Sequence, residues 1–198
     1  MDLGLRDRVV LVASADADER RCTTAALEAE GARVATVDSL AASAAEAQRV
    51  AGELGRLDGV VMCLPQSPSR QVLAAGVEEL YDSWTAVEAV AATFRAALPT
   101  MTARGWGRLV SVMSGSVKWL ADDSDELATL AGLGVLGLHK SAVADVARSG
   151  VAVNAVLRSI DSDPVDVAAV TTFLLSEPAG YLHGVTIGLD GARSSSVF

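Results

Sequence analysis

The chain has 198 residues, of which 51% are hydrophobic and 21% are charged, and its formal net charge at pH 7 is −9. This composition suits one well-packed domain and excludes a disordered chain. The acidic balance, with Lys118 and Lys140 as the only lysines, argues against nucleic acids and anionic membrane surfaces as partners.

Cysteine usage and the length of the apolar runs indicate a reducing compartment. Cys22 and Cys63 lie far apart and no histidine cluster accompanies them, so we expect neither a disulfide framework nor a metal site. The N-terminal segment lacks the features of a signal peptide, and no apolar run reaches the ~18 residues that cross a membrane. We therefore expect a cytoplasmic protein.

Short runs rich in Val, Leu and Ile alternate with long alanine-rich amphipathic segments. The predicted strands cover 8–14, 33–38, 58–65, 107–114, 151–157 and 184–191. The predicted helices cover 19–32, 39–57, 77–104, 124–149 and 163–176. We expect Gly31 to close the first helix, Ser39 to cap the second, Pro99 to break the third and Pro164 to begin the last.

This alternation predicts the fold class. Near-continuous apolar strands between helices are typical of a parallel sheet that is covered on both faces. The sequence therefore predicts an α/β fold with a doubly wound parallel sheet. We expect a single domain over 1–192 and a flexible tail over 193–198.

The stretch GLGVLG at 132–137 matches the dinucleotide-binding pattern G-x-G-x-x-G. That pattern binds a pyrophosphate when it joins a strand to a helix N-terminus, where glycines admit the phosphate and the helix dipole attracts it. GLGVLG instead lies inside a predicted helix, well after the strand that ends near Ser114. Because each interior glycine costs up to ~1 kcal/mol of helix stability, these small residues predict close helix–helix packing.

The turn after the first strand, where a phosphate loop would belong, reads ASADADER at 13–20 and contains no glycine. It carries Asp16, Asp18 and Glu19 instead. Carboxylates near a helix N-terminus stabilise the helix but repel a pyrophosphate. The sequence therefore predicts no dinucleotide cofactor and no cofactor-binding residues.

Five stretches carry a family resemblance that extends over nearly the whole chain. They are DLGLRDRVVLV with AALEAEGARV, GRLDGVV at 55–61, AALPTMTARGWGRLVSVMSGS at 96–116, GLHKSAVADVARSGVAVNAV at 137–156, and FLLSEPAGYLHGVTIGLDGA at 173–192. In this order they resemble the short-chain dehydrogenase/reductase (SDR) family. The resemblance implies a Rossmann-like fold, and two long helices and a C-terminal strand through which family members form dimers and tetramers. GLGVLG lies on one of those helices, where we expect its small residues to let the helices of two subunits pack closely.

The family's catalytic residues are a serine and the tyrosine and lysine of a Tyr-x-x-x-Lys motif, supported by an asparagine. The resemblance places the first three at Ser114, Leu127 and Ala131, so the serine is retained and the proton-transferring pair is replaced. No asparagine occurs before Asn154, and the chain contains no Tyr-x-x-x-Lys. The resemblance therefore implies a degenerate member, for which we name no catalytic residue beyond the retained serine.

Other segments also depart from the family's pattern. MCLP at 62–65 stands where the family has Asn-Asn-Ala-Gly, and Arg158-Ser159 stands where it has Pro-Gly. One strand–helix unit on the adenine side is missing. The segment between Ser159 and Asp163 is very short, although in the family this region carries the lid over the substrate.

Several side chains that could carry chemistry have structural interpretations. Ser114 is inert without a base, and we expect it to bond the backbone at a strand end. His139, late in a long helix, is expected at the surface or an interface, and His183 is expected to be structural or at an interface. Trp106 and Trp119 flank the serine-bearing strand and are either an interface hot spot or core residues.

Charged residues leave further alternatives open. Four acidic residues could hold a cation, but we favour a solvated loop and a helix N-terminus for Asp122, Asp123, Asp125 and Glu126. Arg158 could pair with an acid on a partner, close the empty site, or be solvated.

Three functions follow. The leading hypothesis is a catalytically inactive, pseudoenzyme subunit that assembles through its long helices and C-terminal strand with an active relative or with itself, burying an otherwise exposed apolar patch. The second is a cofactor-independent isomerase, cyclase or dehydratase that uses Ser114 with Asp122 or Asp123, which a ligand-sized cavity beside Ser114 would support. The third is a divergent NAD(P)-dependent oxidoreductase. The substrate and the identity of the partner stay open.

Overall fold

The computed structural model describes residues 2–66, 71–120 and 124–192. In this part of the chain, six parallel strands form one sheet in the order β2-β1-β3-β4-β5-β6. The strands are β1 (Val9–Ser14), β2 (Arg33–Val37), β3 (Gly59–Cys63), β4 (Gly107–Ser114), β5 (Val151–Arg158) and β6 (Thr186–Leu189). The single α/β domain with a doubly wound parallel sheet is confirmed. The predicted tail over 193–198 lies outside the described residues.

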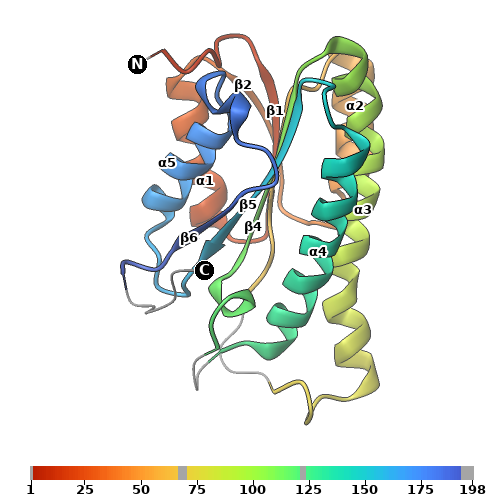
Figure 1. Cartoon of the computed structure of the whole chain (residues 1–198), viewed down its shortest axis with the longest axis vertical. Coiled ribbons are helices and arrows are strands. Elements are labelled where there is room, and N and C mark those ends of the chain that lie inside the picture. Colours follow the sequence, from red (N-terminus) through yellow and green to blue (C-terminus); the bar gives the residue numbers. More distant parts are fainter. Residues whose placement is uncertain (1, 67–70, 121–123, 193–198) are drawn as a thin grey trace.

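Helices cover both faces of the sheet. They are α1 (Ala17–Ala29), α2 (Ser43–Leu54), α3 (Val77–Arg104), α4 (Glu126–Asp145) and α5 (Pro164–Leu175), with short 3-10 helices η1 (Gly115–Val117) and η2 (Pro178–Tyr181). Figure 1 shows α1 and α5 on one face and α2, α3 and α4 on the other. Every residue of β1, β3, β4 and β5 is buried, as expected for strands that are covered twice.

Each face of the sheet has its own hydrophobic core. The larger core, under α2, α3 and α4, includes Leu11, Met62, Phe94, Leu109 and Val135. The core under α1 and α5 includes Val10, Val12, Leu27, Val110 and Leu174. Neighbouring residues of one strand alternate between the two cores because successive side chains point to opposite faces.

Two predicted helix features are wrong. The second helix begins at Ser43 and not at Ser39, and its N-cap Ala42 makes no side-chain cap bond. Ser43 is buried, and its hydroxyl lies 2.6 Å from Thr93 Oγ1 of α3, so a tertiary contact fixes where α2 begins. Pro99 does not break α3, because it lies on the exposed side while Ala97 and Met101 hold the helix against the sheet.

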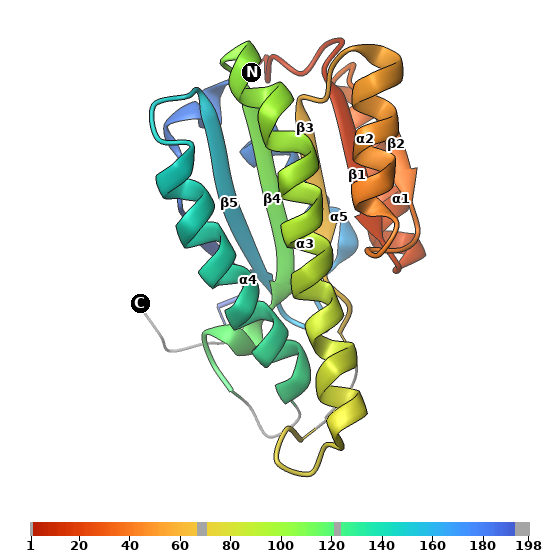
Figure 2. The same ribbon diagram turned by 90° about the vertical axis from the view of Figure 1, so that its right-hand side faces the viewer.

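The edges of the sheet agree with the two segments that the sequence predicts to be shorter than in the family, the adenine-side unit and the lid. In the described residues β2 and β6 form the two edges, so the sheet has no strand beyond β2. Residues 159–163 alone join β5 to α5. α3 projects beyond the strand ends, as Figure 2 shows.

Polar side chains close the amino edge of the sheet. Asp58 is fully buried and accepts hydrogen bonds from the Val9 N–H (2.8 Å) and from Arg56. The Trp106 ring lies 3.7 Å from the guanidinium of Arg8, and its Nε1 donates to Glu177. Trp106 is therefore a half-buried structural residue, as is Trp119, which packs on Gly115 and Gly188.

One described helix passes the length and hydropathy test for a membrane span. α4 has 20 residues and a most apolar window of mean hydropathy 1.4. Its Leu127, Ala131 and Val135 are buried in the domain. The packing explains the apolar composition as that of a core helix.

Candidate functional site

Among the residues that the structure describes, two cavities open at the carboxyl edge of the sheet, where doubly wound folds bind their ligands. The first, which we call the Ser114 cavity, has a volume of about 310 Å³ and lies between the residues after β2, those after β3, the first turns of α3 and the start of α4. The second, the Arg158 cavity, has a volume of about 460 Å³ and lies between the ends of β1, β3 and β5. They adjoin at Ala15, Leu64 and Pro65, which line both.

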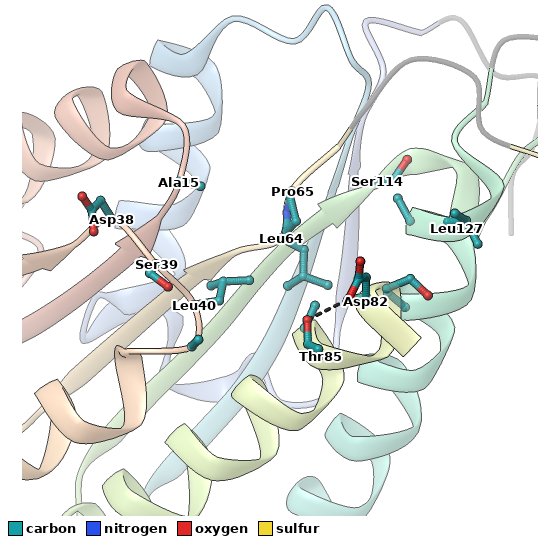
Figure 3. Close-up of a pocket in the computed structure, with 15 residues that line it drawn as sticks. Ala15, Asp38, Ser39, Leu40, Leu64, Pro65, Asp82, Thr85, Ser114 and Leu127 are labelled. Carbon is teal, nitrogen blue, oxygen red and sulfur yellow. Dashed lines mark hydrogen bonds between the residues drawn. The ribbon is translucent and has the colours of Figure 1, made fainter. Parts of the chain in front are cut away.

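The Ser114 cavity brings together the three positions that the resemblance singled out. Ser114, Leu127 and Ala131 all line it, and Figure 3 shows Ser114 and Leu127 at the same end. Leu127 is fully buried and Ala131 nearly so. At the two positions where the resemblance places the family's tyrosine and lysine, the cavity wall is therefore aliphatic.

Ser114 has the structural role that the sequence indicated. Its Oγ lies 2.6 Å from Ser116 Oγ and accepts a hydrogen bond from the Ser116 N–H, so it caps η1. Thr129 of α4 continues this chain of hydroxyls at 2.6 Å from Ser116. Neither a histidine nor a carboxylate bonds to Ser114 among the described residues, so the hydroxyl has no base to activate it.

The Arg158 cavity contains a buried ion pair. Arg158 Nε contacts the Glu19 carboxylate, and the exposed fractions of the two side chains are 9% and 6%. The guanidinium also donates to Gln66 Oε1 and to the Leu64 carbonyl. Of the three alternatives for Arg158, the structure supports closure of the site by an acid of the same chain.

The N-terminus of α1 is satisfied by the protein itself. The Asp16 carboxylate accepts hydrogen bonds from the N–H groups of Asp18 and Glu19, both at 2.9 Å. These are groups that a helix N-terminus would otherwise offer to an anion. Burial raises the pKa of Glu19, the neighbouring Asp16 adds to the rise, and Arg158 opposes it.

Cys63 lies beside this pair, in an environment that disfavours its thiolate. The thiol is buried, and burial raises its pKa well above the usual range. Thiol reactivity requires the thiolate, which this environment disfavours.

GLGVLG lies inside α4, as predicted, and not at a strand–helix junction. A Cβ on Gly132 would lie 2.4 Å from Val117, and one on Gly134 would lie 2.9 Å from Val87 of α3. Gly137 faces open space. The expectation that these glycines serve packing between subunits is therefore wrong for Gly132 and Gly134, which pack within the chain, and stays a prediction for Gly137.

The prediction for His139 was wrong. His139 is buried, its Nε2 lies 2.8 Å from Ser111 Oγ of β4, and its ring packs on Phe94. The polar partner on β4 makes an inward-facing imidazole tolerable, and burial lowers its pKa to about 4. His183 is structural, since its two ring nitrogens contact the Val153 N–H and the Val143 carbonyl.

The structure describes part of the acidic segment before α4. Asp122 and Asp123 lie outside the described residues. Asp125 caps α4 by accepting from the Ala128 N–H, and Glu126 accepts from the Val72 N–H. Asp125 is buried and not solvated, but its position at a helix N-terminus is confirmed. The described residues contain no group of three or more potential metal ligands.

Sequence reasoning missed the carboxylates of the Ser114 cavity, Asp38 and Asp82. Asp38 directly follows β2, so its place at the carboxyl edge could have been inferred from the strand alone. No sequence pattern indicated that Asp82 lies at this edge, because α3 reaches the cavity only where it projects beyond the sheet.

No protein-family model matches the chain. It is 28% identical to the (2S)-[(R)-hydroxy(phenyl)methyl]succinyl-CoA dehydrogenase subunit BbsC of Thauera aromatica, an alignment that covers 94% of this chain and 85% of that protein. It is 26% identical to human (3R)-3-hydroxyacyl-CoA dehydrogenase, with 94% and 95% covered. Nodulation protein G of Azospirillum brasilense is 30% identical, but only 47% of this chain and 48% of that protein are aligned.

Solved structures agree with these relatives. The structure of gox2181 superposes with a TM-score of 0.84 at 17% identity, covering 96% of both chains. A protein described as a dehalogenation enzyme superposes with a TM-score of 0.82 at 21% identity, covering 94% of this chain and 98% of that one. The chain therefore has the single-domain Rossmann-like fold of the short-chain dehydrogenases, and its relatives are dehydrogenases of that family.

Proposed function

We propose that this chain is a subunit without redox chemistry of its own, which assembles with a catalytically complete short-chain dehydrogenase or with a second copy of itself. The observation that carries the proposal is the buried Glu19–Arg158 ion pair at the end of β1. It places a carboxylate and a cation that is already neutralised where the fold family binds a dinucleotide phosphate.

The surrounding residues do not fit a dinucleotide. The loop from Ser14 to Glu19 lacks a glycine that would let backbone approach a phosphate, and Asp16 already accepts from the first N–H groups of α1. Leu127 and Ala131 offer neither a proton donor nor a ribose contact. We therefore propose no hydride transfer at this site.

Exposed apolar side chains on α3 and α4 support assembly. Tyr81 is 72% exposed, Trp84 is 43% exposed and Leu133 of α4 is 52% exposed. The exposed charges of α3 are acidic in its first half (Glu78, Glu79, Asp82 and Glu88) and basic in its second half (Arg95 and Arg104). A twofold partner would bring opposite charges together, because it reverses the helix direction. The Thauera aromatica relative is itself described as a dehydrogenase subunit.

Calorimetric titration with NADH and NADPH tests the missing cofactor site. We expect no heat of binding at ligand concentrations up to roughly 1 mM, where even a weak specific complex is detected. A Glu19→Gly, Arg158→Ala variant serves as the opened control. Micromolar binding by the unmodified chain would refute the proposal and favour a divergent NAD(P)-dependent oxidoreductase, with which the relatives are compatible.

Affinity capture from native extract, followed by size determination of the purified chain, tests assembly. Leu133→Glu should abolish the complex because it places a charge on the exposed face of α4. Leu54→Glu on α2 is the matched control, since Leu54 is exposed to a similar degree (40%) but lies on a different helix from Leu133. A monomer that captures no related dehydrogenase would overturn the assembly. We also propose that the chain is located in the cytoplasm.

A second function is favoured by the Ser114 cavity itself. Its volume of about 310 Å³ is that of a small ligand site, which suits the cofactor-independent isomerase, cyclase or dehydratase. Its walls contain the hydroxyl of Ser114 and the carboxylate of Asp82, but no base bonded to that hydroxyl. An assay with the captured partner removed distinguishes the two, since activity of the chain alone would support the second function.

A further inference from the structure

The Ser114 cavity has the size and lining of a site for one small molecule. Small-ligand pockets begin at about 300 Å³, so this cavity suits a ring-sized body and not a dinucleotide. Its inner wall is aliphatic and buried: Leu64, Ala86, Leu127, Ala128 and Ala131. Apolar contact with this wall would supply most of the affinity.

Four side chains that line the cavity present hydrogen-bond acceptors. The carboxylates of Asp38 and Asp82 accept only. The hydroxyl of Ser83 donates to the Leu80 carbonyl (2.8 Å), and that of Thr85 donates to the Asp82 carbonyl (2.7 Å). Because their protons are used, these hydroxyls present lone pairs to a ligand. Figure 3 shows the Thr85 bond beside the Asp82 carboxylate.

The rim also carries unopposed negative charge. None of the residues that line this cavity is a lysine, arginine or histidine. Asp38 and Asp82 form no ion pair within the described ranges. Glu19 of the adjoining Arg158 cavity differs from them, because Arg158 neutralises its charge. The field at the cavity mouth therefore favours cations and repels carboxylates and phosphates.

We propose that the Ser114 cavity binds a small organic cation, in which a protonated amine lies at the Asp82 rim and a ring-sized apolar body lies against Leu127 and Ala131. The amine donates to these acceptors, and its positive charge is complementary to the two carboxylates. Binding of such a ligand requires no redox chemistry, because the ligand contacts Leu127 and Ala131, which stand where the family has its proton-transferring tyrosine and lysine.

Three probes that share one ring separate charge from shape. Benzylamine, benzyl alcohol and benzoate carry a positive, a neutral and a negative group at pH 7 on the same apolar body. We expect benzylamine to bind the full chain with a Kd on the order of 1 mM, as befits a fragment of this size. Benzyl alcohol should bind roughly tenfold more weakly and benzoate more weakly still, and added salt should reduce the benzylamine affinity. Chemical-shift perturbation locates the probe.

Matched variants decide whether the cavity is responsible. Asp82→Asn should remove the preference for the amine, whereas Glu88→Gln, at an exposed position of α3 outside the cavity, should preserve it. Ala131→Leu fills the apolar wall and should weaken all three probes, with a thermal melt to show that the variant is folded. Equal binding of benzylamine and benzoate, an unchanged preference in Asp82→Asn, or no binding up to about 10 mM would overturn the proposal. A cofactor titration has no bearing on these outcomes, so this inference and the proposed function fail separately.

Discussion

Removing the Glu19 carboxylate should destabilise the fold by about 3 kcal/mol, because loss of one partner leaves the other charge of a buried pair uncompensated. Glu19→Ala leaves Arg158, whose side chain is 9% exposed, with only the amide oxygen of Gln66 and the Leu64 carbonyl as acceptors. Neither acceptor carries a charge. For a domain of this size the loss corresponds to a fall in Tm of roughly 6–12 °C.

The assay is a double-mutant cycle followed by urea and thermal unfolding at pH 7. The cycle comprises Glu19→Leu, Arg158→Met and their combination, and the combination replaces both charges by apolar side chains of similar volume and should recover most of the stability. Asp18→Ala is the control, since Asp18 lies in the same turn of α1 but its side chain is 72% exposed. It should change Tm little, which separates the ion pair from the effect of an acid near the helix N-terminus.

Two results would refute this reasoning. If Glu19→Ala lost no more stability than Asp18→Ala, the pair would not be a buried, mutually dependent unit. If the losses of the single substitutions simply added in the double variant, the two side chains would not be coupled. The closure of the site by Glu19 and Arg158 would then have no energetic basis.

Three further outcomes are expected. Burial lowers the pKa of His139 from 6.5 in the unfolded chain to about 4 in the folded one, so its contribution of up to about 3 kcal/mol to stability is complete above pH 6.5 and is lost as the pH falls towards 4. His139→Gln should therefore flatten the pH dependence of the unfolding free energy between pH 4 and 6.5. An unchanged slope in this variant would contradict the assignment. Asp58→Asn should cost about 2–4 kcal/mol in urea unfolding, because a buried carboxylate loses charge-assisted bonds; a loss below that of a surface substitution would argue against the network. Gly132→Ala should destabilise by about 1–3 kcal/mol through overpacking, whereas Gly137→Ala should gain up to about 1 kcal/mol, and the reverse order would show that the outer face of α4 is the crowded one.

Local patterns were sufficient to predict the architecture. The apolar runs of β1, β4 and β5 identify strands buried on both faces, and the helical periodicity around GLGVLG places those glycines inside α4. The errors arose where a tertiary contact decided the outcome. Ser39 is a good cap by residue type, but the buried Ser43–Thr93 contact begins α2 four residues later.

The candidate site was less predictable, because its residues pair across the sheet. Glu19 and Arg158 each drew attention in the sequence, but only the parallel pairing of β1, β3, β4 and β5 brings them into contact. His139 looked like a surface residue because its partner Ser111 lies on another element. Sequence periodicity reports the face on which a residue lies and not the group that it meets there.

The capped N-terminus of α1 and the Glu19–Arg158 pair together constrain how this lineage can change. A phosphate site in this position would require removal of the Asp16 cap, loss of Glu19 and a new glycine in the same short loop. Each of these steps taken first weakens the fold before it admits any ligand, because the cap and the pair stabilise only in their present form. Any change that creates a dinucleotide site at this edge of the sheet therefore passes through variants that are less stable than the present chain.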